Sequence, residues 1–284
     1  NESSASNELK TIRGRSLAEF VTIEKGLGLD GRVAVVRFDR GDGINALSPE
    51  AMRELTEAAY SFDDDTTTTA VVLTGTTKAF SAGFDLKNDE LRARNTMDTG
   101  SLRHHLKMGP RMTKAWYDME QVTIAAIEGF CVGGGIALGV ALDFRVMASN
   151  AHIRVPEIGL GINMSWQTVP RMLHLIGPAR TKQAVILADQ RISAAEAYDW
   201  GLVEQVAEPG KAFKTAFAFA ERIAAQPPLP VTMTKQTVNR LSGALDDLTS
   251  HMEMDQYALA LKTEDRSEGV NAFLEKRKPR FRGR

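Results

Sequence analysis

The stretch Ile124-Ala-Ala-Ile-Glu-Gly-Phe-Cys-Val-Gly-Gly-Gly-Ile-Ala-Leu-Gly-Val-Ala-Leu-Asp143 decides how the remainder of the chain is interpreted. Its apolar opening residues predict a short buried strand, and its apolar residues from Ile136 onward predict a helix. Gly133, Gly134 and Gly135 stand between the two. Because consecutive glycines are costly in chain entropy, we expect this loop to lie where a side chain cannot fit.

Such a glycine loop has two interpretations from its residues alone. A backbone exposed just before a helix offers free N–H groups and the positive end of the helix dipole. These groups can hold a phosphate or stabilise an oxyanion that develops during a reaction. The loop can equally be a tight turn between strand and helix that binds nothing, and both interpretations stay open at this point.

The composition excludes several classes of protein. A chain of 284 residues with 43% hydrophobic and 25% charged residues is typical of a soluble globular protein with a substantial core. A net charge of −1 gives no reason to expect a nucleic-acid partner. Glycine or charge interrupts every apolar run well before the roughly 20 residues that a membrane span needs, so we expect no membrane partner either.

The single cysteine and the N-terminal residues bear on location. Cys131 has no second cysteine to pair with, which rules out an internal disulfide framework and fits a reducing compartment. We therefore expect the protein to be cytoplasmic. Residues 1–18 hold no apolar core of a signal peptide and are expected to be disordered.

The sequence Gly26-Leu-Gly-Leu-Asp-Gly31 matches the dinucleotide-binding pattern G-x-G-x-x-G but lies in the wrong context. That fingerprint needs a strand before the glycines and a helix after them. Here a second strand-like run, Val33-Ala-Val-Val-Arg-Phe38, follows instead. We interpret the glycines as a hairpin turn between strands at 20–24 and 33–38, with no dinucleotide site.

Strands and helices alternate through the central part of the chain, which predicts an α/β fold with crossover connections. From Lys211 onward the pattern is almost wholly helical, and the composition changes at Pro227-Pro-Leu-Pro230. We therefore expect a core over 19–210 and a helical C-terminal part over 211–284. The expected strands are at 70–74, 124–127, 144–148, 153–155 and 202–206, and the expected helices at 48–62, 102–119, 166–176, 179–187, 193–200, 212–225, 231–241, 245–260 and 265–276.

Five ordered motifs and the C-terminal segment carry a resemblance to the crotonase superfamily, the group of enoyl-CoA hydratases and isomerases. The resemblance covers nearly the whole chain from about residue 20, with order and spacing kept. It implies a ββα-spiral core with a C-terminal helical trimerisation part, a homotrimer or homohexamer, an acyl-CoA substrate, and no metal or further cofactor. The matching segments are Asn45-Ala-Leu, Ala79-Phe-Ser-Ala-Gly-Phe-Asp-Leu, Ala126-Ile-Glu-Gly-Phe-Cys-Val-Gly-Gly-Gly, Pro156-Glu, Arg191-Ile-Ser-Ala-Ala-Glu-Ala and Phe273-Leu-Glu-Lys-Arg-Lys278.

The resemblance also implies how the acyl-CoA is held. In this family two backbone N–H groups bind the thioester oxygen, and the matching positions are Phe84 and Gly134. Fixed dipoles aimed at that oxygen stabilise the enolate that forms in the transition state. For contact with CoA and the acyl chain, the same resemblance implies Arg40 in the loop 39–44, a tail lysine at Lys276, and also Ala82, Asp85, Leu86, Gly133 and Phe273. Trp166 stands in a segment, 163–168, that departs from the glycine-rich pattern of the family, and we expect it to contact the acyl chain and reshape its pocket.

The acid–base residues depart from the pattern of the hydratases. Those enzymes use two glutamates to place and activate a water; the second matches Glu157, while the first falls at Ala137. One buried carboxylate with a raised pKa can still move a proton from one carbon to another. We therefore expect 3,2-enoyl-CoA isomerase-like proton transfer by Glu157.

Two alternatives stay open beside the isomerase hypothesis. The chain can be an enoyl-CoA hydratase, with Ser165 supplying a hydroxyl that the family usually lacks. It can be a CoA-ester-binding homologue that has lost its chemistry together with the carboxylate at position 137. His104 and His105 lie where some superfamily members, such as aryl-CoA dehalogenases, carry a functional histidine, but no nucleophilic aspartate is identified and we interpret them as surface residues.

Overall fold

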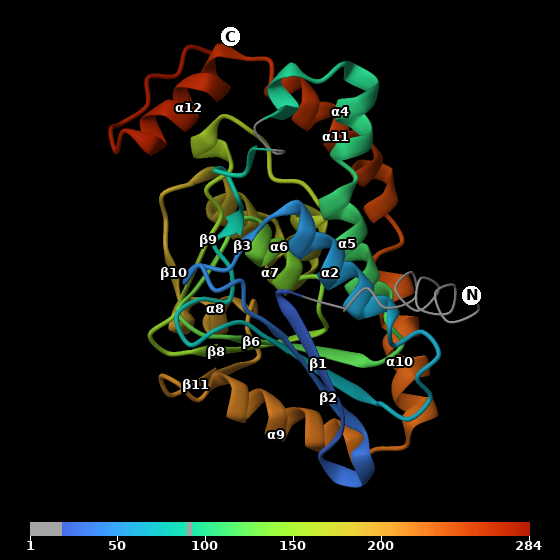
Figure 1. Cartoon of the computed structure of the whole chain (residues 1–284). Coiled ribbons are helices and arrows are strands. Elements are labelled where there is room, and N and C mark those ends of the chain that lie inside the picture. Colours follow the sequence, from blue (N-terminus) through green and yellow to red (C-terminus); the bar gives the residue numbers. More distant parts are fainter. Residues whose placement is uncertain (1–18, 90–92) are drawn as a thin grey trace, which may run out of the picture.

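The computed structural model describes residues 19–89 and 93–284, and the expected disorder of residues 1–18 concerns residues outside this part (Figure 1). Its largest element is a six-stranded sheet. The outermost pair is an antiparallel hairpin and the remaining neighbours are parallel, which confirms the hairpin and the crossover connections. In spatial order the strands are β1 (Val21–Leu27), β2 (Val33–Phe38), β4 (Ala70–Thr74), β6 (Val122–Ile127), β8 (Phe144–Ala148) and β11 (Gln205–Ala207).

Two smaller sheets stand beside the main one and carry the segments that the sequence analysis singled out. The first pairs β3 (Ala46–Leu47) with β5 (Gly83–Phe84) in parallel. The second has the order β10 (Ile192–Ser193), β9 (His152–Arg154) and β7 (Phe130–Val132). An isolated bridge between Ser81 and Cys131 joins the two, so the motifs converge on one place.

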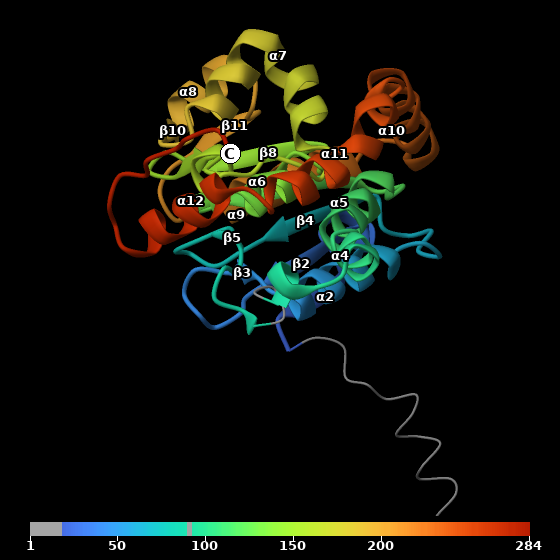
Figure 2. The same cartoon turned by 90° about the horizontal axis from the view of Figure 1, so that it is seen from above.

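Helices cover both faces of the main sheet (Figures 1 and 2). On one face lies α9 (Ala212–Ala224), whose Ala216, Ala220 and Ala224 are fully buried against the strands. The expected helical C-terminal part begins at residue 211, yet this first helix packs as a layer of the core. The other face carries α2 (Pro49–Tyr60), α5 (Met108–Asp118), α6 (Gly134–Gly139), α7 (Thr168–Ile186) and α8 (Ala194–Trp200).

Local sequence signals explain where several helices begin and end. Ser48 caps α2 by accepting a hydrogen bond from the N–H of Ala51, and Ser193 forms a capping box with Glu196 at the start of α8.

The prediction of a single helix at 102–119 is wrong, because the structure has two helices there, α4 (Thr99–His105) and α5. Within α7, Gly177 has a φ of 72° and Pro178 follows, which produces the break expected between 176 and 179.

Three further helices follow α9: α10 (Pro228–Ser242), α11 (Asp246–Ala260) and α12 (Glu264–Leu274). Short 3₁₀ segments are η1 (Leu29–Gly31), η2 (Ala93–Thr96) and η3 (Ile158–Leu160). Buried Lys235 ties α10 to the sheet, since its ammonium lies 2.7 Å from a carboxylate oxygen of Asp143 and donates to Gln121 O. Within the described residues, no helix is both long and apolar enough to cross a membrane.

Large apolar side chains remain exposed along α10 and its junction with α11, among them Leu229, Met233 and Leu241 at 71%, 61% and 76% exposure. Met254 and Tyr257 of α11, by contrast, line a cavity of their own chain. The homotrimer or homohexamer implied by the resemblance stays a prediction.

Candidate active site

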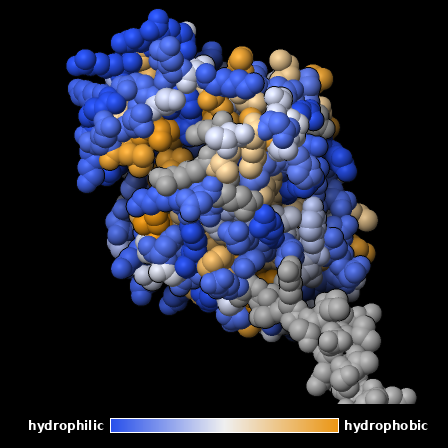
Figure 3. Space-filling model, turned by 45° about the horizontal axis from the view of Figure 1, so that its top comes forward, coloured by the Kyte–Doolittle hydropathy of each residue, from blue (hydrophilic) through white to orange (hydrophobic). Residues whose placement is uncertain are grey.

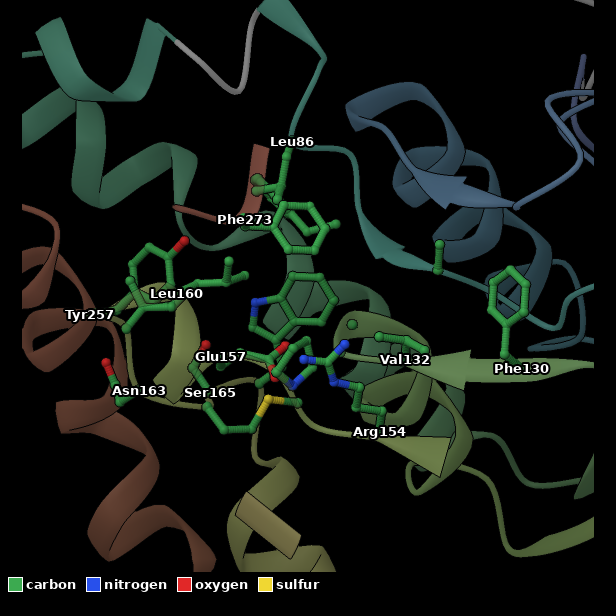
Figure 4. Close-up of a pocket in the computed structure, with 18 of the residues that line it drawn as sticks. Leu86, Phe130, Val132, Arg154, Glu157, Leu160, Asn163, Ser165, Tyr257 and Phe273 are labelled. Atoms are coloured by element: carbon green, nitrogen blue, oxygen red, sulfur yellow. The ribbon is translucent and has the colours of Figure 1, made fainter. Parts of the chain in front are cut away.

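A cavity of about 350 Å³ lies where the two small sheets meet α6, η3 and the C-terminal helices. Figure 3 shows a hollow with hydrophobic side chains on a mostly hydrophilic face, below the C-terminal helix α12. Predicted site residues that line the cavity are Ala82, Phe84, Leu86, Gly133, Gly134, Glu157, Trp166 and Phe273, together with the alternative candidate Ser165. The structure therefore brings most of the expected site together (Figure 4).

Each glycine of the central loop lies where a side chain cannot fit, as expected. A Cβ on Gly133 would come within 2.7 Å of Glu157 Oε1, and the φ of Gly133 is +54°. A Cβ on Gly134 would approach the ring of Trp166 to 2.8 Å. A Cβ on Gly135 would lie 2.7 Å from the carbonyl oxygen of Ser81. The loop is thus packed between the candidate base, an aromatic ring and the β5 segment.

The two backbone positions expected to hold a thioester oxygen belong to neighbouring segments. Gly83, immediately before Phe84, has a φ of +79°, and a Cβ there would lie 2.8 Å from the nitrogen of Gly134. The N–H of Asp85 donates to Leu47 O, 3.2 Å away. Since successive N–H groups of a strand point to opposite sides, the N–H of Phe84 faces away from β3. Gly134 opens α6, where the first N–H groups have no partner within the helix.

A buried polar network fixes the loop that carries Phe84. Asn45, fully buried with a φ of 50°, donates its side-chain amide to Phe38 O at 2.8 Å. Ser81 Oγ donates to Asn45 O and accepts from the N–H of Gly83. The guanidinium of Arg94 stacks on the ring of Phe84, 4.4 Å from its centroid. These contacts define the direction of the backbone at position 84.

Arg40 and Asp85 lie beside this loop but do not line the cavity. Arg40 Nη1 is 2.6 Å from Asp85 Oδ2 and also donates to Ala46 O, so the pair links the loop 39–44 to the β5 segment. Lys276 is exposed at the C-terminal end and does not line the cavity either. Contact of these three residues with CoA stays a prediction.

Glu157 is the predicted acid–base residue. It stands directly before η3, and its Oε1 lies against the backbone of Gly133. Although part of the residue is exposed, Oε2 is buried and has no hydrogen-bond partner. Burial raises the pKa of Glu157 to about 7, an effect that the nearby positive charge of Arg154 only partly offsets. The carboxyl group is therefore poised to gain and lose a proton near neutral pH.

Trp166 lines the cavity from an unusual backbone conformation. Trp166 and Gln167 have φ angles of 62° and 57°. The carbonyl of Trp166 accepts hydrogen bonds from Thr113 Oγ1 and Arg171 Nη1, and the N–H of Gln167 donates to Glu253. Gly109 of α5 provides room for the indole, because a Cβ there would lie only 2.0 Å from Trp166 Cε2. Gly109 was not among the predicted site residues, although a glycine inside a predicted helix is a signal for close packing.

Ala137 is fully buried and does not line the cavity. Glu157 is the one carboxylate residue among those that do, within the described part of the chain. Asn163 and Ser165 also line the cavity, and Asn163 Oδ1 is buried without a hydrogen-bond partner. His104 and His105 are not lining residues.

The C-terminal helices close the cavity from above. Phe273 of α12 lies beside Leu86, and Tyr257 of α11 lines the cavity near Leu160 (Figure 4). Phe273, which the resemblance assigns to contact with CoA or the acyl chain, lines the cavity of its own chain. Across residues 19–89 and 93–284 there is no cluster of three or more His, Cys, Asp or Glu side chains able to hold a metal ion.

Part of the cavity is basic, and its residues, His152, Arg154 and Arg191, were not among the predicted site residues. Strand alternation carried a usable signal, since His152 and Arg154 are two residues apart in a strand and share one face. Arg191 opens one of the motifs that carry the family resemblance, but no binding or catalytic role was predicted for it.

Comparison with known proteins places this site in a family. The model of the enoyl-CoA hydratase/isomerase family matches residues 29–284. A short-chain-enoyl-CoA hydratase of Clostridium acetobutylicum is 34% identical over 250 residues, covering 88% of this chain and 94% of that protein. A crotonyl-CoA hydratase of Syntrophomonas wolfei is 34% identical over 265 residues, covering 93% and 98%.

Solved structures agree with the sequence relatives. The crystal structure of a carnitinyl-CoA hydratase from Mycobacterium avium superposes with a TM-score of 0.82 at 28% identity. The match covers 94% of this chain and 100% of that one. These relatives are named as hydratases. The extent of the match and the convergence of the motifs on one cavity identify the chain as a member of the enoyl-CoA hydratase/isomerase family, the crotonases.

Proposed function

We propose that this chain processes an enoyl-CoA thioester with Glu157 as its acid–base group. The observation that carries the proposal is the buried carboxylate of Glu157, unpaired at Oε2 and packed against the loop that ends in Gly134. A thioester oxygen held by the N–H groups of Phe84 and Gly134 would place the carbons of the acyl chain near that carboxylate. An acyl-CoA substrate follows from the family, and the roles of these three residues belong to the proposal.

The chemistry follows from the two parts of the site. The carboxylate of Glu157 removes a proton from the carbon next to the thioester, and the electron pair moves onto the thioester oxygen. Two N–H donors stabilise the enolate, and the removal of one such donor typically costs about 10²–10³-fold in rate. The protonated Glu157 then returns the proton to a different carbon, which moves the double bond.

Hydration and isomerisation both fit this site, and different observations favour each. The names of the relatives favour hydration. The residues of the cavity favour isomerisation, because Glu157 is the only carboxylate residue described there and Ala137 is buried behind the lining. For hydration, a second group must hold the water, and Asn163 and Ser165 are the uncharged candidates.

Two turnover assays separate the candidates. We expect conversion of a 3-enoyl-CoA to a 2-enoyl-CoA to be faster than hydration of crotonyl-CoA, because general acid–base assistance from a second group is typically worth about 10²–10⁴-fold. Hydration at the faster rate would contradict the isomerase hypothesis and establish the hydratase candidate. Absence of both activities together with micromolar binding of the CoA esters would contradict catalysis and favour the binding homologue.

The pH dependence of turnover reports on Glu157. The carboxylate must be ionised to remove a proton, and the pKa of Glu157 is about 7. We expect kcat/KM to rise about tenfold per pH unit below this value and to level off above it. A rate profile that is flat between pH 5 and 8 would contradict the assignment of Glu157 as the base. Both turnover assays are run across the same series of pH values, so that isomerisation and hydration each yield a pH–rate profile.

A further inference from the structure

The wall of the cavity formed by the small sheet β10–β9–β7 carries positive charge on one face. Phe130 pairs with His152, and Val132 with Arg154, across the parallel strands β7 and β9. These four side chains line the cavity, whereas the alternate residues Cys131 and Ile153 are completely buried in the core. Arg191, immediately before β10, adds a second guanidinium. We call His152, Arg154 and Arg191 the basic wall.

The charge of the basic wall has no carboxylate to neutralise it. Within residues 19–89 and 93–284, none of its three residues forms an ion pair. Arg154 Nε donates to Ala188 O at 2.8 Å, which orients the guanidinium, and its terminal nitrogens have no hydrogen-bond partner among the described residues. The pKa of His152 is lowered by burial and by the charges of Arg191 and Arg154, so at neutral pH the positive charge belongs to the two arginines.

Glu157 does not serve as the counter-charge. It forms no ion pair with Arg154, and its pKa stays raised by burial despite that arginine. Arg154 is partly buried and Arg191 is exposed, so the charge of Arg154 is the more costly one to leave without an anionic partner in a largely apolar cavity. The cavity therefore offers an anion a charge-assisted, bidentate site, because the planar fork of arginine matches a carboxylate.

An acyl-CoA always carries negative charge on the phosphates of CoA, and it carries a further carboxylate only where the acyl group has a second carboxyl group. Arg154 lies three residues before Glu157, and its carbonyl accepts a hydrogen bond from the N–H of Gly133 at 3.0 Å. Figure 4 shows its side chain extending from β9 into the part of the cavity that holds Glu157. The phosphates are separated from the thioester by the whole pantetheine arm, so an anion beside the reacting carbons belongs to the acyl group.

We propose that the basic wall selects acyl-CoA substrates whose acyl group ends in a carboxylate, with Arg154 as the principal contact. The inference rests on the proposed function for the position of the thioester. Trp166 also lines the cavity, and its indole, packed against Gly109 and Gly134, limits the space for an acyl chain. We therefore expect a short acyl group, a dicarboxylic acid joined to CoA through one of its two carboxyl groups.

Binding of saturated thioesters tests this inference without any turnover. The probes are glutaryl-CoA, pentanoyl-CoA and CoA itself, which share the CoA part and differ at the acyl end, with dissociation constants measured by calorimetry. A hydrogen bond to a charged group is worth about 1.5–3 kcal/mol, which corresponds to roughly 10- to 150-fold in affinity. We expect wild-type protein to bind glutaryl-CoA tighter than pentanoyl-CoA by a factor in this range.

Arg154→Met should abolish the preference for glutaryl-CoA while the affinities for pentanoyl-CoA and CoA change less than about threefold. Arg154→Lys should keep part of the preference, because the charge remains but the bidentate geometry is lost. Arg191→Met provides a second variant of the wall and should reduce the same preference. Arg111→Met, an exposed arginine outside the cavity, is the matched control and should change nothing.

Three results would overturn the inference. One is equal affinity of wild-type protein for glutaryl-CoA and pentanoyl-CoA. Another is a loss of affinity for all three ligands in Arg154→Met, which would assign the wall to the phosphates of CoA. The third is a preference that survives in both Arg154→Met and Arg191→Met. Because no probe reacts, these results are independent of whether Glu157 catalyses any reaction.

Discussion

Glu157→Gln is expected to lower kcat for the preferred enoyl-CoA by about 10²–10⁴-fold, the usual contribution of a general acid–base group. The amide keeps the size of the side chain but cannot carry the proton between carbons. The dissociation constant of a saturated acyl-CoA should change less than about threefold, because the backbone N–H groups of Phe84 and Gly134 are untouched. Steady-state kinetics and calorimetry provide the two measurements.

Stability controls separate this loss from misfolding. Burial holds the pKa of Glu157 at about 7 in the folded protein, against an ordinary value of 4.5. Between these values the folded state binds more protons than the unfolded state, so the carboxyl group lowers the free energy of unfolding as pH rises, by at most about 3 kcal/mol above pH 7. Glu157→Gln lacks this effect and should be at least as stable as wild type at pH 8.

Glu57→Gln makes the same chemical change on the exposed side of α2 and should leave turnover unchanged. A Glu157→Gln protein that retains more than a tenth of wild-type kcat would rule out the proposed role of the carboxylate. Equal losses of kcat and of acyl-CoA affinity would instead indicate a structural role.

Gly83→Ala is expected to have the second largest effect, on both stability and activity. The φ of Gly83 is +79°, and a Cβ would lie 2.5 Å from Val132 O and 2.8 Å from the nitrogen of Gly134. The left-handed backbone and the overpacking together should cost roughly 2–5 kcal/mol. Moving β5 away from α6 would separate the two N–H groups proposed to hold the thioester oxygen, so kcat should fall by about 10²–10³-fold.

Gly26→Ala is the matched control for the backbone conformation. Its φ is +73°, but no atom lies within 4 Å of the added Cβ. It should lose only about 1–2 kcal/mol, the cost of the left-handed conformation, and keep full activity. Chemical denaturation and steady-state kinetics of both variants test the prediction. Equal destabilisation in the two variants, with activity retained in Gly83→Ala, would show that β5 can shift without affecting the site.

Local chemistry made much of the fold predictable from the sequence. The buried strand Ala70–Thr74 has the predicted ends, because it is a continuous apolar run between polar segments. Ser48 and Pro49 marked the start of α2 in the same way. The break between α4 and α5 was missed although the sequence carries its signal. Pro110 has no N–H to donate to the carbonyl of residue 106 and its ring clashes with that carbonyl, so one helix ends there and the next has the proline in its first turn.

The candidate site was predictable where it rests on backbone geometry and on ordered motifs. The glycine loop, Phe84 and Glu157 line one cavity because their segments meet at the edges of two small sheets. Arg40, Asp85 and Lys276 are not lining residues, and sequence order alone could not distinguish them from those that are. The basic wall depends on which face of β9 turns toward the cavity, which only the three-dimensional arrangement reveals.

A structure determined with a bound saturated acyl-CoA tests the central claim most directly. The account predicts that the thioester oxygen lies about 2.7–3.1 Å from the backbone nitrogens of both Phe84 and Gly134. It also predicts that the first carbons of the acyl chain lie in contact with the carboxylate of Glu157. A thioester oxygen that faces solvent, or an acyl chain directed away from Glu157, would contradict it.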